Sequence, residues 1–337
     1  MKFFHLSHTD LDGYAAQFVS NFYIKNVHNF NSNYGHEIDE KFELILNKLD
    51  DEKSLILISD LNLTLSQCEK FSQKIAEKNA KIILLDHHIS GIECVKNYSW
   101  YFMDSSRCAT KIVYDFFSKI FGENDKLHKL VNVVNAADIW LKDDADFELG
   151  KVCLGLISGA KELNKVMFAN ESFEYLQFLI SKICGFINMQ NAHIALDSAV
   201  HSLKKEFFKS SFDDTLGNLI SHYVVERLSA RKDELSVIYK DKKGILTYNI
   251  GSTSIIGNDF LVNNPDIDFF VDITSKKTLS FRANGNTDVS LIAKNLVGGG
   301  GHINASGGLF GAFKDCNDYT NIKAQFQNLI DQKTKEE

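Results

Sequence analysis

The sequence lacks an excess of basic residues. Its 337 residues include 37 Lys and Arg against 44 Asp and Glu, which gives a formal net charge of −7. Proteins that bind duplex DNA in general usually carry the opposite imbalance, so we expect no general duplex-DNA binder. The negative charge remains compatible with a small anionic substrate, because bound divalent metal ions would reverse the charge locally.

Cysteine pairs and long apolar runs are also missing. The six cysteines are scattered and no Cys-x-x-Cys pair occurs. This excludes a zinc ribbon and a small disulfide scaffold, and it favours reduced thiols packed as small apolar residues. The first residues, Met1 to Leu6, are too few and too soon followed by polar residues to form a signal peptide. Because no run approaches the length of a membrane span, we expect a cytoplasmic protein without membrane association.

The length of the chain predicts two domains, at roughly 150 residues for each. Hydrophobic residues at 44% and charged residues at 24% are ordinary for a globular protein. Residues 173–209 are mostly helical in pattern, and no flexible Ser/Gly linker interrupts them. We predict a first domain at residues 1–186, a helical connector at 187–211 and a second domain at 212–330.

Three apolar strands in the first domain each end in side chains that can bind a metal ion or move a proton. Helical patterns alternate with these strands, which predicts a βαβ array around a parallel sheet. The carboxyl ends of such strands meet at the edge where open α/β sheets bind their ligands. The side chains are His8, Asp10 and Asp12 after the first strand, Asp60 after the second, and Asp86, His87 and His88 after the third.

Each of these motifs alone has a purely structural alternative. Asp favours helix starts, so Asp10 and Asp12 also fit an N-terminal cap, and the histidines also fit capping or core positions. Asp138 lies in the apolar helical pattern Leu130–Trp140. Because an unpaired buried carboxylate is costly, Asp138 is either a salt-bridge partner or a metal ligand. Three such strand ends in under ninety residues favour a shared site.

The second domain is predicted to contain two strand pairs, at residues 235–250 and 268–282, and a helix at 288–296. Four glycines, Gly298 to Gly301, then precede His302. A glycine loop that exposes backbone N–H groups beside a histidine is typical of a phosphate cradle, and the alternative is a structural turn.

In this order the motifs resemble the four motifs of the DHH phosphoesterases. The resemblance rests on His8-x-Asp10-x-Asp12-Gly13, the strand ending in Asp60, Asp86-His87-His88, and Asp138. The segment from Gly298 to Gly307 resembles the signature of the associated C-terminal DHHA1 domain. The opening motif and Ile256-Gly257-Asn258 are most similar to the oligoribonuclease (nano-RNase) branch.

The resemblance spans about Phe3 to Phe313 and implies an α/β fold. An N-terminal DHH domain would hold a mainly parallel sheet flanked by helices. A helical connector would lead to a smaller C-terminal α/β DHHA1 domain with a mixed sheet. The family relationship implies a phosphoesterase with two metal ions and a cleft between the domains.

Roles for individual residues follow from the same resemblance. His8 and Asp10 would hold one ion, Asp12 and His87 would hold the other, and Asp60 would bridge the two. Some members of the family place the first histidine four residues before the aspartate, whereas His8 stands two residues before Asp10.

The remaining residues would complete the site. Asp138 would be a further metal ligand, Asp86 would orient its neighbours, and His88 would contact the scissile phosphate. The residues expected to bind a terminal phosphate or the nucleotide are Arg282, Gly299, Gly300, Gly301 and His302.

The residue types agree with phosphodiester hydrolysis, which needs a hydroxide near neutral pH and neutralisation of the phosphoryl charge. Two ions about 3.5–4 Å apart supply both. Carboxylates with imidazoles and without thiolates suit Mn²⁺, with Mg²⁺ next, whereas structural zinc would prefer cysteine.

We therefore expect a Mn²⁺-dependent exonuclease that converts very short RNA to nucleoside monophosphates, with 3′-phosphoadenosine 5′-phosphate as a related substrate. The enzyme alternatives are hydrolysis of polyphosphate or of a linear or cyclic dinucleotide. Tyr248 and Phe281 are candidates for base stacking near Arg282 or for core packing. A non-catalytic scaffold should have lost metal ligands, yet every expected carboxylate is present. A homodimer is compatible with the family, although no stretch of the sequence demonstrates one.

Overall fold

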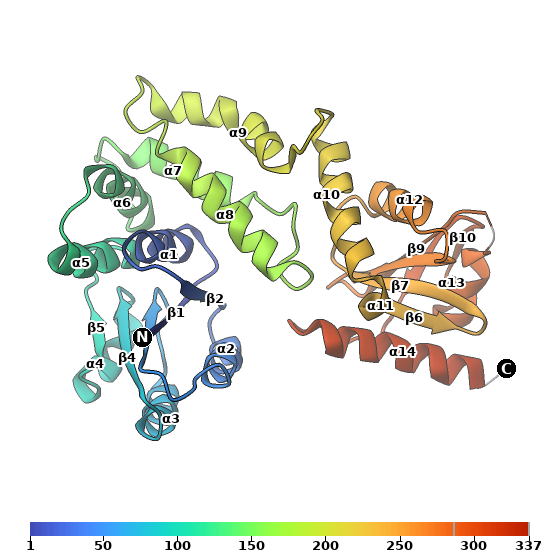
Figure 1. Cartoon of the computed structure of the whole chain (residues 1–337), viewed down its shortest axis with the longest axis horizontal. Coiled ribbons are helices and arrows are strands. Elements are labelled where there is room, and N and C mark those ends of the chain that lie inside the picture. The colour runs from blue at the N-terminus through green and yellow to red at the C-terminus, as the bar shows by residue number, and fades with distance from the viewer. Residues whose placement is uncertain (286, 336–337) are drawn as a thin grey trace. The chain divides into compact units, whose positions relative to one another are not determined.

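Five parallel strands form the first sheet of the computed structural model, which describes residues 1–285 and 287–335. The strands are β1 (Lys2–Ser7), β2 (Val27–Asn31), β3 (Ser54–Ser59), β4 (Ala80–Asp86) and β5 (Tyr101–Met103), in the spatial order β2-β1-β3-β4-β5 (Figure 1). The chain therefore reverses its direction of winding between β1 and β3. Open α/β sheets of this order bind ligands in the crevice beyond the carboxyl ends of those two strands.

Helices cover both faces of this sheet (Figure 1). They are α1 (Leu11–Tyr23), α2 (His36–Leu46), α3 (Leu65–Ala76), α4 (Ile92–Asn97, after a short 3₁₀ turn at Ile89–Gly91), α5 (Ala109–Phe121), α6 (Asp125–Asp138) and α7 (Phe147–Ser158). Alternate strand residues such as Phe4 and Ile56 pack against α2 and α3, where Phe42 and Phe71 stack with ring centroids 3.7 Å apart. On the other face, Phe3 contacts Phe117 of α5.

A buried polar chain ties α1 to the ends of β1 and β3. The His5 ring bonds through Nδ1 to Ser20 Oγ at 2.7 Å and through Nε2 to Ser59 Oγ at 2.8 Å. Ser59 Oγ also lies 2.8 Å from Ser7 Oγ. Burial lowers the pKa of His5 to about 3, so the ring is neutral and can both donate and accept. These bonds fix the two strand ends immediately before His8 and Asp60.

The chain divides into two compact units. The first comprises residues 1–159 and 176–200, and the second comprises residues 160–175 and 201–337. One division follows α7, and the other two fall within the helices α8 (Ala169–Ile183) and α9 (Ala192–Phe208). Helix α9 lies within the residues predicted to form the helical connector.

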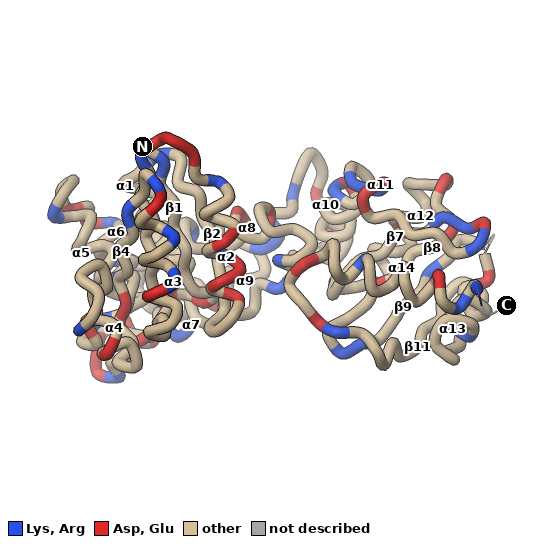
Figure 2. Tube along the Cα trace, turned by 90° about the horizontal axis from the view of Figure 1, so that it is seen from below, with Lys and Arg blue, Asp and Glu red and all other residues tan. Residues whose placement is uncertain are grey.

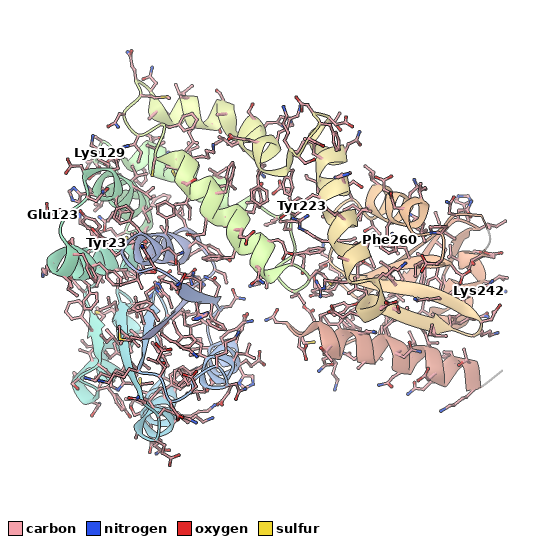
Figure 3. The ribbon with its side chains drawn as sticks, viewed as in Figure 1. Tyr23, Glu123, Lys129, Tyr223, Lys242 and Phe260 are labelled. Carbon is pink, nitrogen blue, oxygen red and sulfur yellow. The ribbon has the colours of Figure 1, made fainter. Side chains whose placement is uncertain are left out.

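The second unit is built on a six-stranded mixed sheet in the order β10-β11-β9-β8-β7-β6. Its strands are β6 (Ser236–Tyr239), β7 (Lys242–Tyr248), β8 (Phe269–Ile273), β9 (Thr278–Ala283), β10 (Gly300–His302) and β11 (Ala305–Leu309). Its helices are α10 (Leu216–Ala230), α11 (Lys232–Leu235), α12 (Thr253–Asn263), α13 (Val289–Val297) and α14 (Tyr319–Lys335). Phe260 of α12 points toward the sheet (Figure 3) and contacts Phe270, with ring centroids 5.8 Å apart.

A side chain of α14 occupies one edge of this sheet. The side-chain oxygen of Gln327 accepts a bond from Ile238 N, and its nitrogen donates to Ile238 O, both at 3.2 Å. Ile238 lies in β6, which is the last strand of the sheet. The amide of Gln327 thus satisfies both backbone groups of this edge residue.

The predicted fold class is confirmed: both units are α/β, with a parallel sheet in the first and a mixed sheet in the second. Strand β2 and helix α12 were not predicted. Lys and Arg positions are spread along both units rather than gathered in one stretch (Figure 2). None of the described helices combines the length and the apolar composition that a membrane span requires.

The second sheet contains one buried carboxyl whose ionisation should lower stability. Burial raises the pKa of Asp272 to about 7 from 3.8, although bonds from Thr247 Oγ1 and Ile250 N oppose the shift. The folded state therefore binds more protons than the unfolded state between these pH values. The contribution of Asp272 is fully present below pH 3.8 and is lost as the pH rises through about 7.

We expect Asp272→Asn to flatten the fall of stability with pH, because Asn keeps the acceptor oxygen without the charge. The difference in the free energy of unfolding between variant and wild type should grow by up to about 1.4 kcal/mol per pH unit between pH 4 and 7. Urea unfolding across this range measures it. Parallel pH profiles of the two proteins would contradict the assignment.

Candidate metal centre

The loop after β1 places His8 and Asp10 at the start of α1. Asp10 caps the helix, because its Oδ1 accepts a bond from Gly13 N at 3.0 Å, and its Oδ2 lies 2.7 Å from His8 Nδ1. A Cβ atom at Gly13 would lie 2.4 Å from His8 O, so only glycine fits this turn. The cap and the metal-ligand interpretations of Asp10 are therefore not exclusive, since one oxygen serves the helix and the other faces the histidine.

Asp12 is buried against the N-terminus of α5. Its Oδ2 accepts a bond from Ala109 N at 2.7 Å, and its Oδ1 accepts one from Thr110 N at 2.8 Å. The first N–H groups of a helix lack partners within the helix and favour negative charge, so α5 holds this carboxylate in place. Asp12 Oδ2 lies 3.8 Å from His87 Nε2.

Asp60 lies between two histidines at the end of β3. Its Oδ1 is 3.4 Å from His87 Nε2, and its Oδ2 is 3.8 Å from His8 Nδ1. The backbone of Asp60 adopts φ 56°, a left-handed conformation that costs energy for a residue other than glycine. Strained backbone of this kind clusters at functional sites, where the surrounding structure enforces it.

The residues after β4 point in different directions. Nε2 of His87 faces three carboxylates, since Asp138 Oδ2 lies 3.6 Å away in addition to Asp12 and Asp60. His88 instead directs Nδ1 to Asp86 Oδ1 at 2.7 Å. Asp86 is fully buried, and its Oδ2 accepts a bond from Tyr101 at 3.2 Å, while the orienting role that the resemblance implies for it stays a prediction.

Burial and the neighbouring negative charges raise the pKa values of two carboxyls, Asp60 and Asp138. Burial, followed by the negative charges of Asp12, Asp10 and Asp138, holds the pKa of Asp60 well above its ordinary value. Burial and the charges of Asp12 and Asp10 raise the pKa of Asp138 to about 9. Burial also lowers the pKa of His87.

Two histidine–aspartate pairs have pKa shifts that favour the charged form of a side chain, against the effect of burial. Burial acts against ionisation of Asp10, but the hydrogen bond and charge of His8 outweigh it and lower the pKa of this carboxyl. Burial likewise acts against protonation of His88, but the hydrogen bond and charge of Asp86 outweigh it and raise the pKa of the imidazole.

Two oxygens show that these residues fit a divalent cation. Asp60 Oδ2 and Asp138 Oδ2 are buried and have no hydrogen-bond partner among the described residues. Buried polar atoms are otherwise almost always paired, and a cation would satisfy both oxygens. Ligand atoms lie within 4.8 Å of one another in three sets, namely His8, Asp10 and Asp60; Asp60, Asp86, His87 and His88; and Asp12, Cys108 and Asp138.

The structure thus brings together all the metal-binding side chains predicted in the first unit, although their individual roles stay predictions. Cys108 was not expected there. Burial, with the charges of Asp12 and Asp138, raises the pKa of its thiol well above the ordinary value. Because only the thiolate is a good metal ligand, a cation would have to displace the proton of Cys108 before this thiol could bind it.

Tyr34 is a further residue that sequence reasoning missed. Its hydroxyl lies 3.0 Å from His88 Nε2, and its ring lies 4.5 Å from that of His8, centroid to centroid. It follows β2, which the sequence pattern did not reveal, and a tyrosine carries no metal-binding signal. Only the pairing of β2 with β1 brings this loop to the centre.

The substrate-binding residues predicted in the second unit lie on neighbouring strands. Arg282 of β9 and His302 of β10 both pair with Ala305 of β11, so their side chains point to the same face of the sheet. Arg282 Nη2 donates to Ser254 Oγ of α12 at 2.6 Å.

The expected glycine loop is instead a helix cap followed by a strand. Gly298 ends α13 with φ 65°, and Gly300 begins β10. A Cβ atom at Gly299 would lie 2.2 Å from Gly307 O, and one at Gly301 would lie 2.6 Å from Ala305 O. These glycines therefore permit the close approach of β11, and their predicted contact with phosphate stays a prediction.

The candidate base-stacking residues of the second unit take their structural alternative. Tyr248 and Phe281 are both buried in the core, so their rings offer no exposed face to a base.

A curated protein and a solved structure are each similar to nearly the whole chain. No protein-family model matches the chain. A curated 3′,5′-cyclic-nucleotide phosphodiesterase from Helicobacter pylori (strain ATCC 700392 / 26695) is 42% identical over 344 residues, covering 98% of this chain and 99% of that protein. The crystal structure of an uncharacterized protein from Helicobacter pylori G27 is also 42% identical, with a TM-score of 0.93 and coverage of 98% and 99%.

More distant structures add little. RecJ from Thermus thermophilus, solved in complex with Mn²⁺, is 12% identical, with a TM-score of 0.31 and coverage of 99% of this chain and 52% of that one. A similarity this low supports no conclusion about metal or mechanism.

We expect binding of a divalent cation to release protons. Near pH 7.5 the metal-free protein keeps a proton on Asp138, because its pKa is raised to about 9, and a cation must displace this proton. Metal affinity should therefore increase as the pH rises toward 9. Calorimetric titration with Mn²⁺ in two buffers of different ionisation enthalpy counts the protons released. Asp138→Asn should release fewer, and equal heats in both buffers for the wild type would contradict the shifts.

Proposed function

The chain belongs to the family of the Helicobacter pylori 3′,5′-cyclic-nucleotide phosphodiesterase, and from that premise we propose that it hydrolyses 3′,5′-cyclic nucleotides to nucleoside monophosphates. The membership confirms the expectation of an enzyme, a phosphodiesterase. It gives no support to the oligoribonuclease branch suggested by the opening motif. The DHH resemblance and this relative agree on the bond that is cleaved.

One observation carries the proposal: histidines and carboxylates from separate segments converge at the carboxyl edge of the first sheet, and two buried oxygens among them lack partners within the described chain. His8, Asp10 and Asp60 would hold one cation. Asp12, His87 and Asp138 would hold a second, with Asp60 shared. Bound divalent cations, with Mn²⁺ the first candidate and Mg²⁺ the next, would neutralise phosphoryl charge and make water more acidic.

The chain's own side chains orient the substrate. Asp86 accepts the Nδ1 hydrogen of His88, so that Nε2 would be the nitrogen that contacts a phosphoryl group. The chain Tyr101–Asp86–His88 fixes the ring before substrate arrives, so little ordering is needed on binding. The N-terminus of α5 holds the carboxylate of Asp12 in place, so this side chain would not move when a cation or substrate binds.

The other substrates expected from the sequence also contain a phosphorus–oxygen bond that a phosphoesterase could hydrolyse. Short RNA, 3′-phosphoadenosine 5′-phosphate and dinucleotides also present a phosphate ester, and polyphosphate presents an anhydride. The presence of every predicted carboxylate at the centre supports a catalyst over a scaffold. We place cyclic nucleotides first because the relative that matches 98% of this chain is named for them.

Product analysis tests the proposal. The wild type, Asp60→Ala and Asp50→Ala would each receive 3′,5′-cyclic AMP, 3′,5′-cyclic GMP, a two- to five-nucleotide RNA, 3′-phosphoadenosine 5′-phosphate and polyphosphate, with Mn²⁺ or Mg²⁺. We expect nucleoside monophosphate from the cyclic nucleotides with the wild type, and no turnover with Asp60→Ala, because the shared ligand is lost.

Asp50→Ala is the matched control, since it removes an exposed carboxylate whose ion pair with Lys2 lies on the surface. It should behave like the wild type. Turnover of RNA or polyphosphate without turnover of cyclic nucleotides would overturn the proposed substrate. Activity retained by Asp60→Ala would overturn the proposed centre.

A further inference from the structure

We propose that Tyr34 is a substrate-contacting residue, whose hydroxyl and the Nε2 atom of His88 together bind one phosphoryl oxygen. The inference rests on the proposed function only in that the substrate carries a phosphate ester. It adds a residue outside the motifs that the sequence singled out.

The position of Tyr34 between two histidines is the first observation. Its ring lies against His8, with centroids 4.5 Å apart and planes inclined at 36°, and meets His88 edge to face at 5.6 Å. The residue is nevertheless accessible to solvent, since Tyr34 is 43% exposed. A ring used only for packing would be buried, and one used only to cover the surface would not contact two residues of the centre.

The hydrogen-bond chain that ends at Tyr34 is the second observation. Tyr101 donates to Asp86, Asp86 accepts from His88 Nδ1, and His88 Nε2 lies 3.0 Å from the Tyr34 hydroxyl. This is the one hydrogen bond that the described residues provide to that hydroxyl. A phenol has one hydrogen to donate and two lone pairs, so further capacity remains at the open end of the chain.

That geometry suits a phosphoryl oxygen. Two groups 3.0 Å apart can both reach a single oxygen at ordinary hydrogen-bond distances of about 2.7–3.0 Å. When Nε2 of His88 carries a hydrogen, the Tyr34 oxygen accepts it, and the hydrogen of the Tyr34 hydroxyl can turn toward the incoming oxygen while the ring stays in place. His88 alone would provide one contact, and Tyr34 supplies the second.

The loop that carries Tyr34 is anchored on both sides. Before it, Asn33 accepts a bond from Thr9 Oγ1 at 2.8 Å and donates through Nδ2 to Glu37 at 2.7 Å. After it, Gly35 takes φ 83° and accepts a bond from Gln67 Nε2 at 3.1 Å. A side chain held between two fixed residues is ordered before substrate arrives, which reduces the entropy lost on binding.

Tyr34→Phe tests the contact, because it removes the hydroxyl and keeps the ring against His8. We expect the dissociation constant of inorganic phosphate for the Mg²⁺-loaded protein to rise about tenfold to a hundredfold, as for loss of one hydrogen bond to a charged group. With cyclic AMP, KM should rise more than kcat falls. Titration calorimetry measures the first quantity and steady-state kinetics the second.

Tyr98→Phe is the matched control, since it removes the same atom from a ring that packs against Trp100 away from the centre. It should bind phosphate like the wild type. Unchanged or tighter phosphate binding by Tyr34→Phe would overturn the inference, because the hydroxyl would then be idle or a competitor. Parallel loss of Mg²⁺ affinity would also overturn it, since Tyr34 would then act on the centre itself.

Failure of the proposed function looks different. A wild type that turns over no cyclic nucleotide would overturn that function, while the phosphate affinities of the wild type and Tyr34→Phe would still decide the role of Tyr34.

Discussion

The repulsion among carboxylates gathered in a buried space is the constraint on which the first unit depends. Asp10, Asp12, Asp60 and Asp138 approach one another at the edge of the sheet, and burial with like charge disfavours ionisation of Asp60 and Asp138. The surroundings offset this unevenly: α5 supplies two N–H groups to Asp12, and His8 supports Asp10. Asp60 and Asp138 keep one oxygen each without a partner in the described chain. The fold therefore leaves carboxylates without enough positive partners, and a bound cation can neutralise them.

The topology of the sheet determines which segments supply the side chains of the centre. Strands β1 and β3 are parallel neighbours, and the chain reverses its direction of winding between them. The loops that follow the two strands therefore open onto the same crevice, and β4 adds His87 beside them. The buried bonds of His5 to Ser20 and Ser59 hold the strands in this register without introducing another charge. Strain in the backbone of Asp60 turns its carboxylate toward both histidines. Buried contacts just before the strand ends thus fix distances within the crevice.

The sequence could reveal the strand ends because their signal is local. Alternating apolar strands and helices predicted the parallel sheet, and the polar residues after β1, β3 and β4 followed from it. Tyr34 could not be found this way, because its position depends on β2 pairing with β1. Cys108 reaches Asp12 and Asp138 only through the packing of helices. In the second unit, a run of glycines favours a loop. In the structure, however, Gly300 and Gly301 belong to β10, because the absence of a side chain lets the backbone of β11 pair closely with them.

The bond between Gln327 and the backbone of Ile238 bears on how the molecule behaves at high concentration. An edge strand with unsatisfied N–H and C=O groups is a template on which another chain can add its own strand, and such growth leads to aggregates and fibrils. At Ile238 the amide of Gln327 already fills that place from within the same molecule. A sheet of six strands can thus end in water at β6 while keeping neighbouring molecules from extending it there.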